Sequence, residues 1–77
     1  MKATQRVETE NNEVRVYKKT TGELVSTRSY ETADEAYKAF TETVEWLKKN
    51  PIKNEHLLII RFRWGNVMCI EEIDSEN

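Results

Sequence analysis

The chain is poor in the residues that build disulfide bonds, metal sites and phosphate-binding loops. Its 77 residues include one cysteine, one histidine, one proline and two glycines. A single cysteine forms no internal disulfide, and structural metal sites draw on several His, Cys or Asp ligands at fixed spacings. Gly22 and Gly65 both stand in expected turns, so no glycine-rich loop remains to hold a phosphate group.

Long apolar runs are also missing. No stretch approaches the roughly 20 apolar residues that a membrane-spanning helix needs, and no apolar signal segment follows Met1. The lone Cys69 is expected on the core side of a strand, where a thiol behaves as a small hydrophobic group. Because disulfides form in oxidising compartments, a single buried cysteine favours a cytoplasmic protein, and we expect no membrane association.

Groups for catalysis do not converge in the sequence. His56, the only histidine, is expected at the start of a strand with no Ser or Cys nucleophile beside it. Glu71 and Glu72 are neighbours on one strand, so their side chains point to opposite faces and form no acid–base pair. We therefore expect a protein that is not an enzyme, with no cofactor, no metal and no small-molecule substrate.

Charges of the two signs nearly balance. The chain has 14 acidic and 12 basic side chains and a net charge of −2, which gives no general support for nucleic-acid binding. The length corresponds to one domain. We expect residues 1–11 to form a flexible or edge N-terminal segment, residues 12–73 a single ββαββ domain, and residues 74–77 an acidic tail.

One amphipathic helix is predicted between Thr32 and Asn50. Thr32 and Glu35 have the spacing of a capping box, and Pro51 prevents continuation of the helix after Asn50, which can form a left-handed cap. At 100° per residue the apolar side chains form one stripe. Its members are Ala33, Ala36, Tyr37, Phe40, Val44 and Leu47, and Trp46 lies on the flank of the stripe.

Two β-hairpins flank this helix. The first is predicted to turn at Thr20–Gly22 and to place Val14, Val16, Leu24 and Tyr30 against the helix. The second is predicted to turn at Gly65-Asn66, which pairs Trp64 with Val67, Phe62 with Cys69, Ile60 with Glu71, and Leu58 with Ile73 on the core side. The fold class is therefore α+β: ββαββ, in two layers, with one helix on a four-stranded, mainly antiparallel sheet.

One helix covers one face of such a sheet, and the other face is left open. The predicted second hairpin leaves apolar and arginine side chains together on that open face, a composition typical of protein contact surfaces. The candidate partner-binding residues are Arg15, Tyr17, Val25, Leu57, Ile59, Arg61, Arg63, Met68 and Ile70, with Trp46 as a second contact. On this prediction, Ile59→Asp leaves the fold largely intact and abolishes association.

These features predict a small protein–protein interaction module whose open sheet face binds a protein partner or a second copy of itself as a homodimer. The alternative is a platform for single-stranded nucleic acid, on which Arg15, Arg61 and Arg63 contact phosphates and Tyr17 stacks on a base. In size and layout only, a compact acidic ββαββ chain resembles small phage- or plasmid-encoded proteins that inhibit a host protein by binding it. No motif carries this resemblance, and it assigns no residues.

Overall fold

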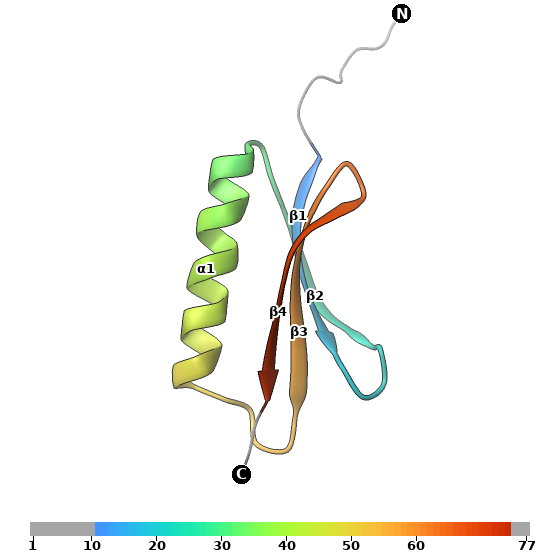
Figure 1. Ribbon diagram of the computed structural model, residues 1–77, viewed down its shortest axis with the longest axis vertical. Coiled ribbons are helices and arrows are strands. Elements are labelled where there is room, and N and C mark those ends of the chain that lie inside the picture. Colours follow the sequence, from blue (N-terminus) through green and yellow to red (C-terminus); the bar gives the residue numbers. More distant parts are fainter. Residues whose placement is uncertain (1–10, 75–77) are drawn as a thin grey trace, which may run out of the picture.

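The fold has two layers, a single helix and a four-stranded sheet (Figure 1). The computed structural model describes residues 11–74. Along the chain, the elements are β1 (Asn12–Lys18), β2 (Leu24–Tyr30), α1 (Ala33–Lys49), β3 (His56–Arg63) and β4 (Asn66–Asp74). This confirms the predicted α+β class and its ββαββ order. The first ten and last three residues of the predicted terminal segments lie outside the described residues.

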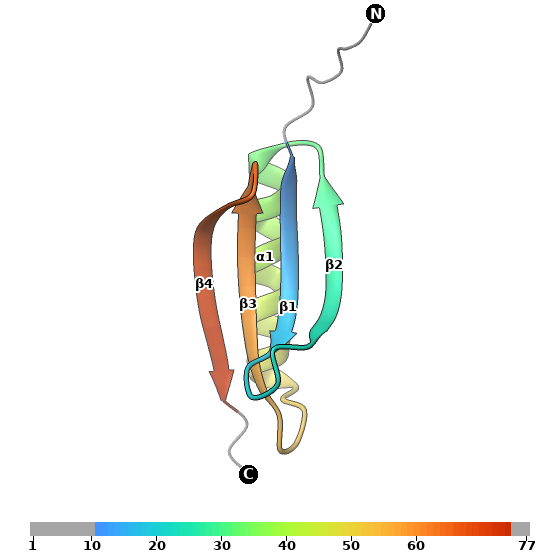
Figure 2. The ribbon, with the colours of Figure 1, turned by 90° about the vertical axis from the view of Figure 1, so that its right-hand side faces the viewer.

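The strands lie in the order β2-β1-β3-β4, and every neighbouring pair is antiparallel. The two central strands, β1 and β3, come from different hairpins and join them into one sheet. The helix lies behind this central pair when the sheet is viewed from its other side (Figure 2). No helix in the described residues is long and apolar enough to span a membrane.

The helix begins at the residue that the sequence indicates. The side chain of Thr32 accepts a hydrogen bond from the backbone N–H of Glu35 at 3.1 Å, which satisfies one of the free donors at the helix start. The helix also ends at Asn50, but the predicted left-handed cap is wrong, because Asn50 has a φ of −128°. Instead, its backbone N–H and its side-chain amide both donate to the carbonyl of Trp46.

The core lies between α1 and one face of the sheet. The helix contributes the predicted stripe, although Tyr37 at its border stays 53% exposed. The buried apolar residues are Val14, Val16, Ala36, Phe40, Val44, Leu47, Leu57, Ile59 and Ile73, with Tyr30, Ala39 and Cys69 packed against them. The predicted inward positions of Val14, Val16, Tyr30 and Cys69 are therefore confirmed.

The turn of the second hairpin lies one residue earlier than predicted. Trp64 (φ 53°) and Gly65 (φ 79°) are its two central residues, between the paired Arg63 and Asn66. Two successive positive φ angles are the geometry of a type I′ turn, whose twist matches that of the flanking strands. The prediction of a Gly65-Asn66 loop is therefore wrong.

A β-bulge adds to this shift. Phe62 pairs with Val67 and Arg61 pairs with Cys69, so Met68 has no partner on β3. Beyond the bulge, Ile59 faces Glu71 and Leu57 faces Ile73. Because a shift of one residue moves each side chain of a strand to the other face, β3 turns its odd-numbered residues toward the helix, not its even-numbered ones.

The first hairpin has a similar irregularity near its turn. Val16 pairs with Ser26 and Val14 pairs with Arg28, as predicted. Closer to the turn, Leu24 pairs with Tyr17, and Val25 is the unpartnered residue of a bulge. Leu24 is therefore 46% exposed and lies on the same face as Tyr17, and the prediction that it joins the core is wrong.

Candidate functional site

The candidate site is the sheet face that α1 does not cover, here called the open face. Residues directly opposite each other on antiparallel strands share a face, so the strand registers define its members. They form three rows across β2, β1, β3 and β4. The rows are Leu24–Tyr17–Leu58–Glu72, Thr27–Arg15–Ile60–Ile70 and Ser29–Glu13–Phe62–Val67, and the pair His56–Asp74 continues the face at the end of the β3–β4 hairpin.

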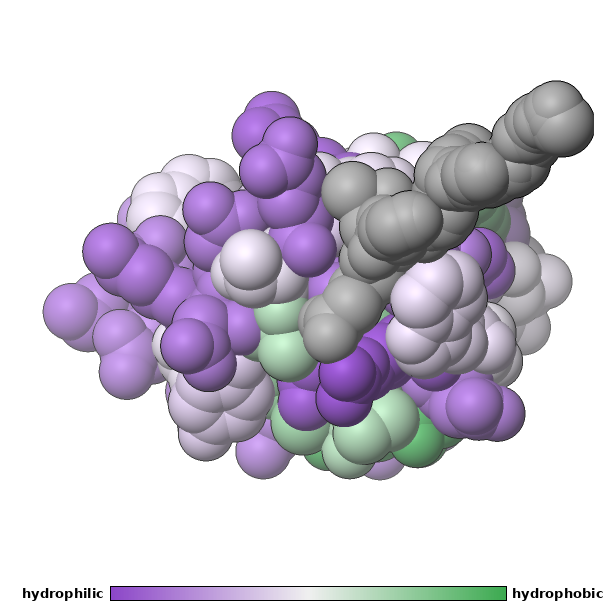
Figure 3. All heavy atoms as spheres, turned by 90° about the horizontal axis from the view of Figure 1, so that it is seen from above, coloured by the Kyte–Doolittle hydropathy of each residue, from purple (hydrophilic) through white to green (hydrophobic). Residues whose placement is uncertain are grey.

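This face carries a large share of apolar side chains. Leu58, Ile60 and Phe62 run along its central strand β3 and are half-buried by their neighbours. Val67 and Ile70 on β4 are 53% and 55% exposed. Viewed from the end with the β3–β4 turn, hydrophobic residues gather along the β4 rim, whereas the helix side is hydrophilic (Figure 3). A contiguous apolar surface of this kind on a small domain indicates a contact site.

Some of the predicted contact residues lie on the open face, and others lie at the sheet edges or on the helix side. Arg15, Tyr17 and Ile70 lie on it, as predicted. Val25 and Met68 are the extra residues of the two bulges and are 48% and 46% exposed, at the two edges of the sheet.

Four predicted contact residues lie on the opposite face, and their assignment to the open face is wrong. Leu57 and Ile59 are 2% and 0% exposed and belong to the core. Arg61 pairs with the inward-facing Val14, and Arg63 pairs with the fully buried Asn12. The physical cause is the one-residue change of register in the second hairpin, which exchanges the two faces of β3.

The change of register in the second hairpin brings four residues to the open face that the sequence assigns to the core: Leu58, Ile60, Phe62 and Val67. The bulge in the first hairpin brings Leu24 there as well. β3 is apolar on both faces over Leu57–Ile60, so alternation alone does not orient it. The one available signal is the Trp64-Gly65 pair, because a type I′ turn favours glycine at its second central position.

Arg15 lies near the centre of the open face and is held there by three hydrogen bonds. Its Nε and Nη2 donate to Oε1 of Glu13 at 2.8 and 2.5 Å, and its Nη1 donates to the hydroxyl of Tyr17 at 3.0 Å. Its guanidinium lies over the ring of Phe62, 4.6 Å from the centroid. The hydrogen bonds to Tyr17 and then to Glu13 raise the pKa of Arg15 above its ordinary value.

The remaining charge of the open face is also paired. Glu72, at the β4 edge, accepts a hydrogen bond from the ammonium group of Lys19 in the loop after β1, and this contact raises the pKa of Lys19. The charged members of the open face are Glu13, Arg15, Glu72 and, at the end of β4, Asp74, which shares the face with its partner His56. Each acidic group has a basic partner: Glu13 has Arg15, Glu72 has Lys19 and Asp74 has His56.

Arg61 takes a different role from the one predicted. On the helix side of β3, its guanidinium approaches the ring of Tyr37 on α1, 5.7 Å from the ring centroid. A cation over an aromatic ring is favourable, and here it joins the sheet to the first half of the helix. Arg61 is therefore a residue of the interface between the two layers.

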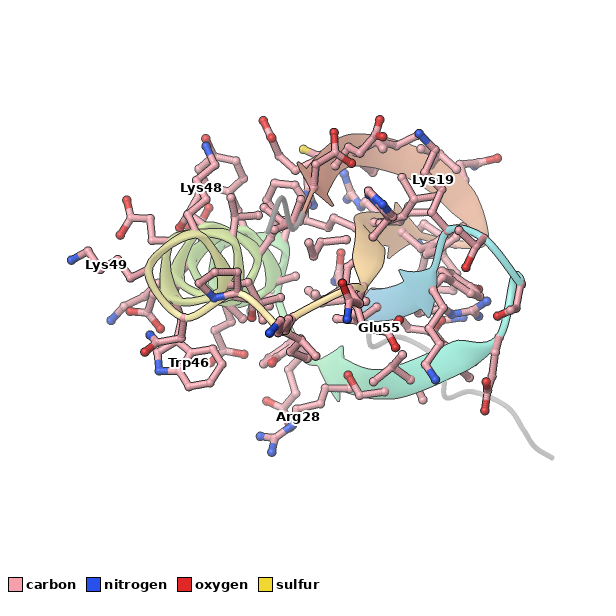
Figure 4. All side chains as sticks on the ribbon, turned by 90° about the horizontal axis from the view of Figure 1, so that it is seen from below. Lys19, Arg28, Trp46, Lys48, Lys49 and Glu55 are labelled. Carbon is pink, nitrogen blue, oxygen red and sulfur yellow. The ribbon has the colours of Figure 1, made fainter. Side chains whose placement is uncertain are left out.

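Trp46, the predicted second contact, lies apart from the open face. It is 61% exposed on the flank of α1, on the same side of the molecule as Arg28 of β2 (Figure 4). With Arg28 and Tyr30 it lines a shallow groove of about 440 Å³ between α1 and β2. This groove and the open face are separate surfaces, because the sheet lies between them.

In residues 11–74, no three His, Cys, Asp or Glu side chains lie close enough together to hold a metal ion. His56 bonds through Nδ1 to the carboxylate of Asp74 at 2.9 Å, across the open end of the β3–β4 hairpin. This hydrogen bond lowers the pKa of Asp74. Glu71 and Glu72 lie on opposite faces, as predicted, since they pair with Ile59 and Leu58.

Comparison with known proteins gives no relative. No protein-family model matches the chain, and searches of curated proteins and of solved structures give no significant match.

Proposed function

We propose that this protein is a non-enzymatic protein–protein interaction module that binds through its open face. The observation that carries the proposal is the uncovered apolar surface along β3 and β4, formed by Leu58, Ile60, Phe62, Val67 and Ile70. Hydrophobic burial contributes about 25 cal/mol per Å² of apolar surface removed from water, so this face gains free energy when a protein covers it.

The electrostatics of the open face favour a protein over a single-stranded nucleic acid. A nucleic-acid platform needs cations that are available to phosphates, together with several exposed rings. Of the three arginines expected on the face, only Arg15 lies there, and its guanidinium already donates three hydrogen bonds to Glu13 and Tyr17. We therefore propose no nucleic-acid function, and expect titration with single-stranded DNA or RNA to show no salt-dependent binding.

A cytoplasmic location is part of the proposal. Cys69 is free and half-buried against the core, which is compatible with a reducing compartment.

Affinity capture from the source cell tests the proposed function. Ile70→Asp places a charge on the open face, and Ile52→Asp places the same charge on an apolar residue of similar exposure in the loop after α1. We expect the wild type and Ile52→Asp to retain the same protein, which can be a further copy of this chain, and Ile70→Asp to lose it. Equal retention by both variants would contradict the proposal.

A further inference from the structure

We propose that the open face binds the open face of a second copy, so that two chains form a face-to-face homodimer with the helices outside. This inference rests on the proposed function, because it names the partner of the same surface. The dimer would have four layers, with two sheets packed about 10 Å apart as in a β-sandwich. Three properties of the face support this partner.

The first property is the size of the open face. With eight residues in β3, at about 3.3 Å per residue and about 4.8 Å between strands, the four-stranded sheet is roughly 26 Å by 19 Å. Two such faces present a flat area of about 1,000 Å², and the relief of the side chains adds to it. A specific interface buries at least about 1,000 Å² in total, so two copies of this face lie at the lower end of the area that a specific dimer needs.

The second property is charge. A surface whose charges of one sign are unpaired repels its own copy, whereas a face whose charges are paired does so much less. Glu13 is paired with Arg15, Glu72 with Lys19 and Asp74 with His56, so the open face meets its own copy without repulsion between unpaired charges. The Arg15–Glu13 pair lies on the central strand β1, and it enters the contact already hydrogen-bonded. A strongly acidic or basic partner would meet only charges that are already paired.

The third property is the state of the sheet edges, which are the other surfaces through which two sheets associate. Both edge strands are bulged, β2 at Val25 and β4 at Met68, and β4 also carries Glu71 and Glu72. Bulges and charges on edge strands hinder the addition of another strand. Face-to-face packing is therefore favoured over the extension of the sheet.

Sedimentation equilibrium of the full chain over a range of concentrations tests the inference. We expect the wild type and Ile52→Asp to approach twice the 9.1 kDa mass of one chain. We expect Ile70→Asp to stay at the mass of one chain, with a dimer dissociation constant at least tenfold higher. Circular dichroism and urea unfolding of each variant verify that it folds.

A charge exchange identifies the surface. Arg15→Glu leaves two acidic residues near the centre of the open face, and Glu13→Arg leaves two basic ones. Each variant alone is expected to repel its own copy and remain a monomer. An equimolar mixture is expected to recover a dimer that contains one chain of each kind, detected by native mass spectrometry. Recovery would require the two faces to be opposite each other.

The outcomes separate the inference from the proposed function. A wild type that remains a monomer, while capture of a different protein depends on Ile70, would overturn the homodimer and retain the binding face. A dimer that withstands Ile70→Asp and both charge variants would show a contact elsewhere, such as the β2 edge, and would also overturn the inference. Both proposals would be contradicted if the wild type stays a monomer and Ile70→Asp captures the same protein as the wild type.

Discussion

At the residue scale, the contrast between Ile59 and Ile60 defines the two faces of the sheet. The two are neighbours on β3 and have the same side chain, but Ile59 is 0% exposed beneath the helix and Ile60 is half-buried on the open face. The first therefore contributes to folding and the second to the contact surface.

We expect Ile59→Ala to lower the free energy of unfolding by about 2–5 kcal/mol, because it leaves a cavity in the core. Ile60→Ala is expected to cost less, about 1 kcal/mol, because its side chain is only partly buried in one chain. Urea unfolding of the monomeric chain in an Ile70→Asp background measures both. A larger loss for Ile60 would mean that the faces are assigned incorrectly.

The same reasoning reverses the expected effect of Ile59→Asp. A domain of this size has a stability of roughly 4–12 kcal/mol, and an unpaired carboxylate at a fully buried position removes a large part of it. The substitution is therefore expected to unfold the chain and is not a test of binding.

Trp64 is a second residue whose environment allows a specific prediction. It has a φ of 53°, a left-handed conformation that is unfavourable for a bulky side chain, and it is 55% exposed in the β3–β4 turn. Trp64→Asn creates an Asn-Gly pair, the preferred sequence of a type I′ turn.

We expect Trp64→Asn to stabilise the chain by about 1 kcal/mol, because asparagine adopts the left-handed conformation more readily. Urea unfolding measures this change in the free energy of unfolding. Gly65→Ala, at a φ of 79° in the same turn, is the control and is expected to destabilise. Destabilisation by Trp64→Asn would show that the indole contributes more through contacts than its conformation costs.

At the element scale, the second hairpin is closed by a type I′ turn at one end and by the His56–Asp74 contact at the other. The hydrogen bond from His56, followed by the nearby positive charges, lowers the pKa of Asp74 from its ordinary value of 3.8. A folded-state pKa below the unfolded one means that this contact stabilises the fold above pH 3.8 and that the stabilisation is lost as the pH falls through the lower value.

We expect His56→Asn to raise the pKa of Asp74 toward its ordinary value, measured by NMR titration of the side-chain carboxyl group. The effect on stability is expected to be small, because the two side chains are 42% and 51% exposed and solvent screens them. An unchanged pKa in His56→Asn would show that this hydrogen bond does not form in solution.

At the scale of the whole molecule, the two faces of the sheet differ in what covers them. One face is filled by α1 and holds the core together, while the other exposes apolar residues and carries only paired charges. A chain of 77 residues buries a small core, so an additional apolar face is costly to leave in water. The solution mass of the wild type, compared with that of Ile70→Asp, measures whether a second copy covers this face.

The sequence by itself determined the elements and most of their ends. Thr32, Glu35 and Pro51 mark the helix locally, since capping and the geometry of proline act within a few residues. The alternation of Val14 and Val16 with Arg15 and Tyr17 fixed the inner face of β1, because Arg15 and Tyr17 are polar or amphipathic. From these local signals the ββαββ order and the two-layer architecture follow.

Only the tertiary structure decided which face of β3 meets the helix. Leu57–Ile60 is apolar throughout, so both orientations bury hydrocarbon, and the choice depends on a turn position and on a bulge at Met68. A shift of one residue then exchanges Ile59 and Arg61 with Ile60 and Phe62. The strand order is likewise set by the pairing of β1 with β3, a contact between residues far apart in the chain that no local pattern encodes.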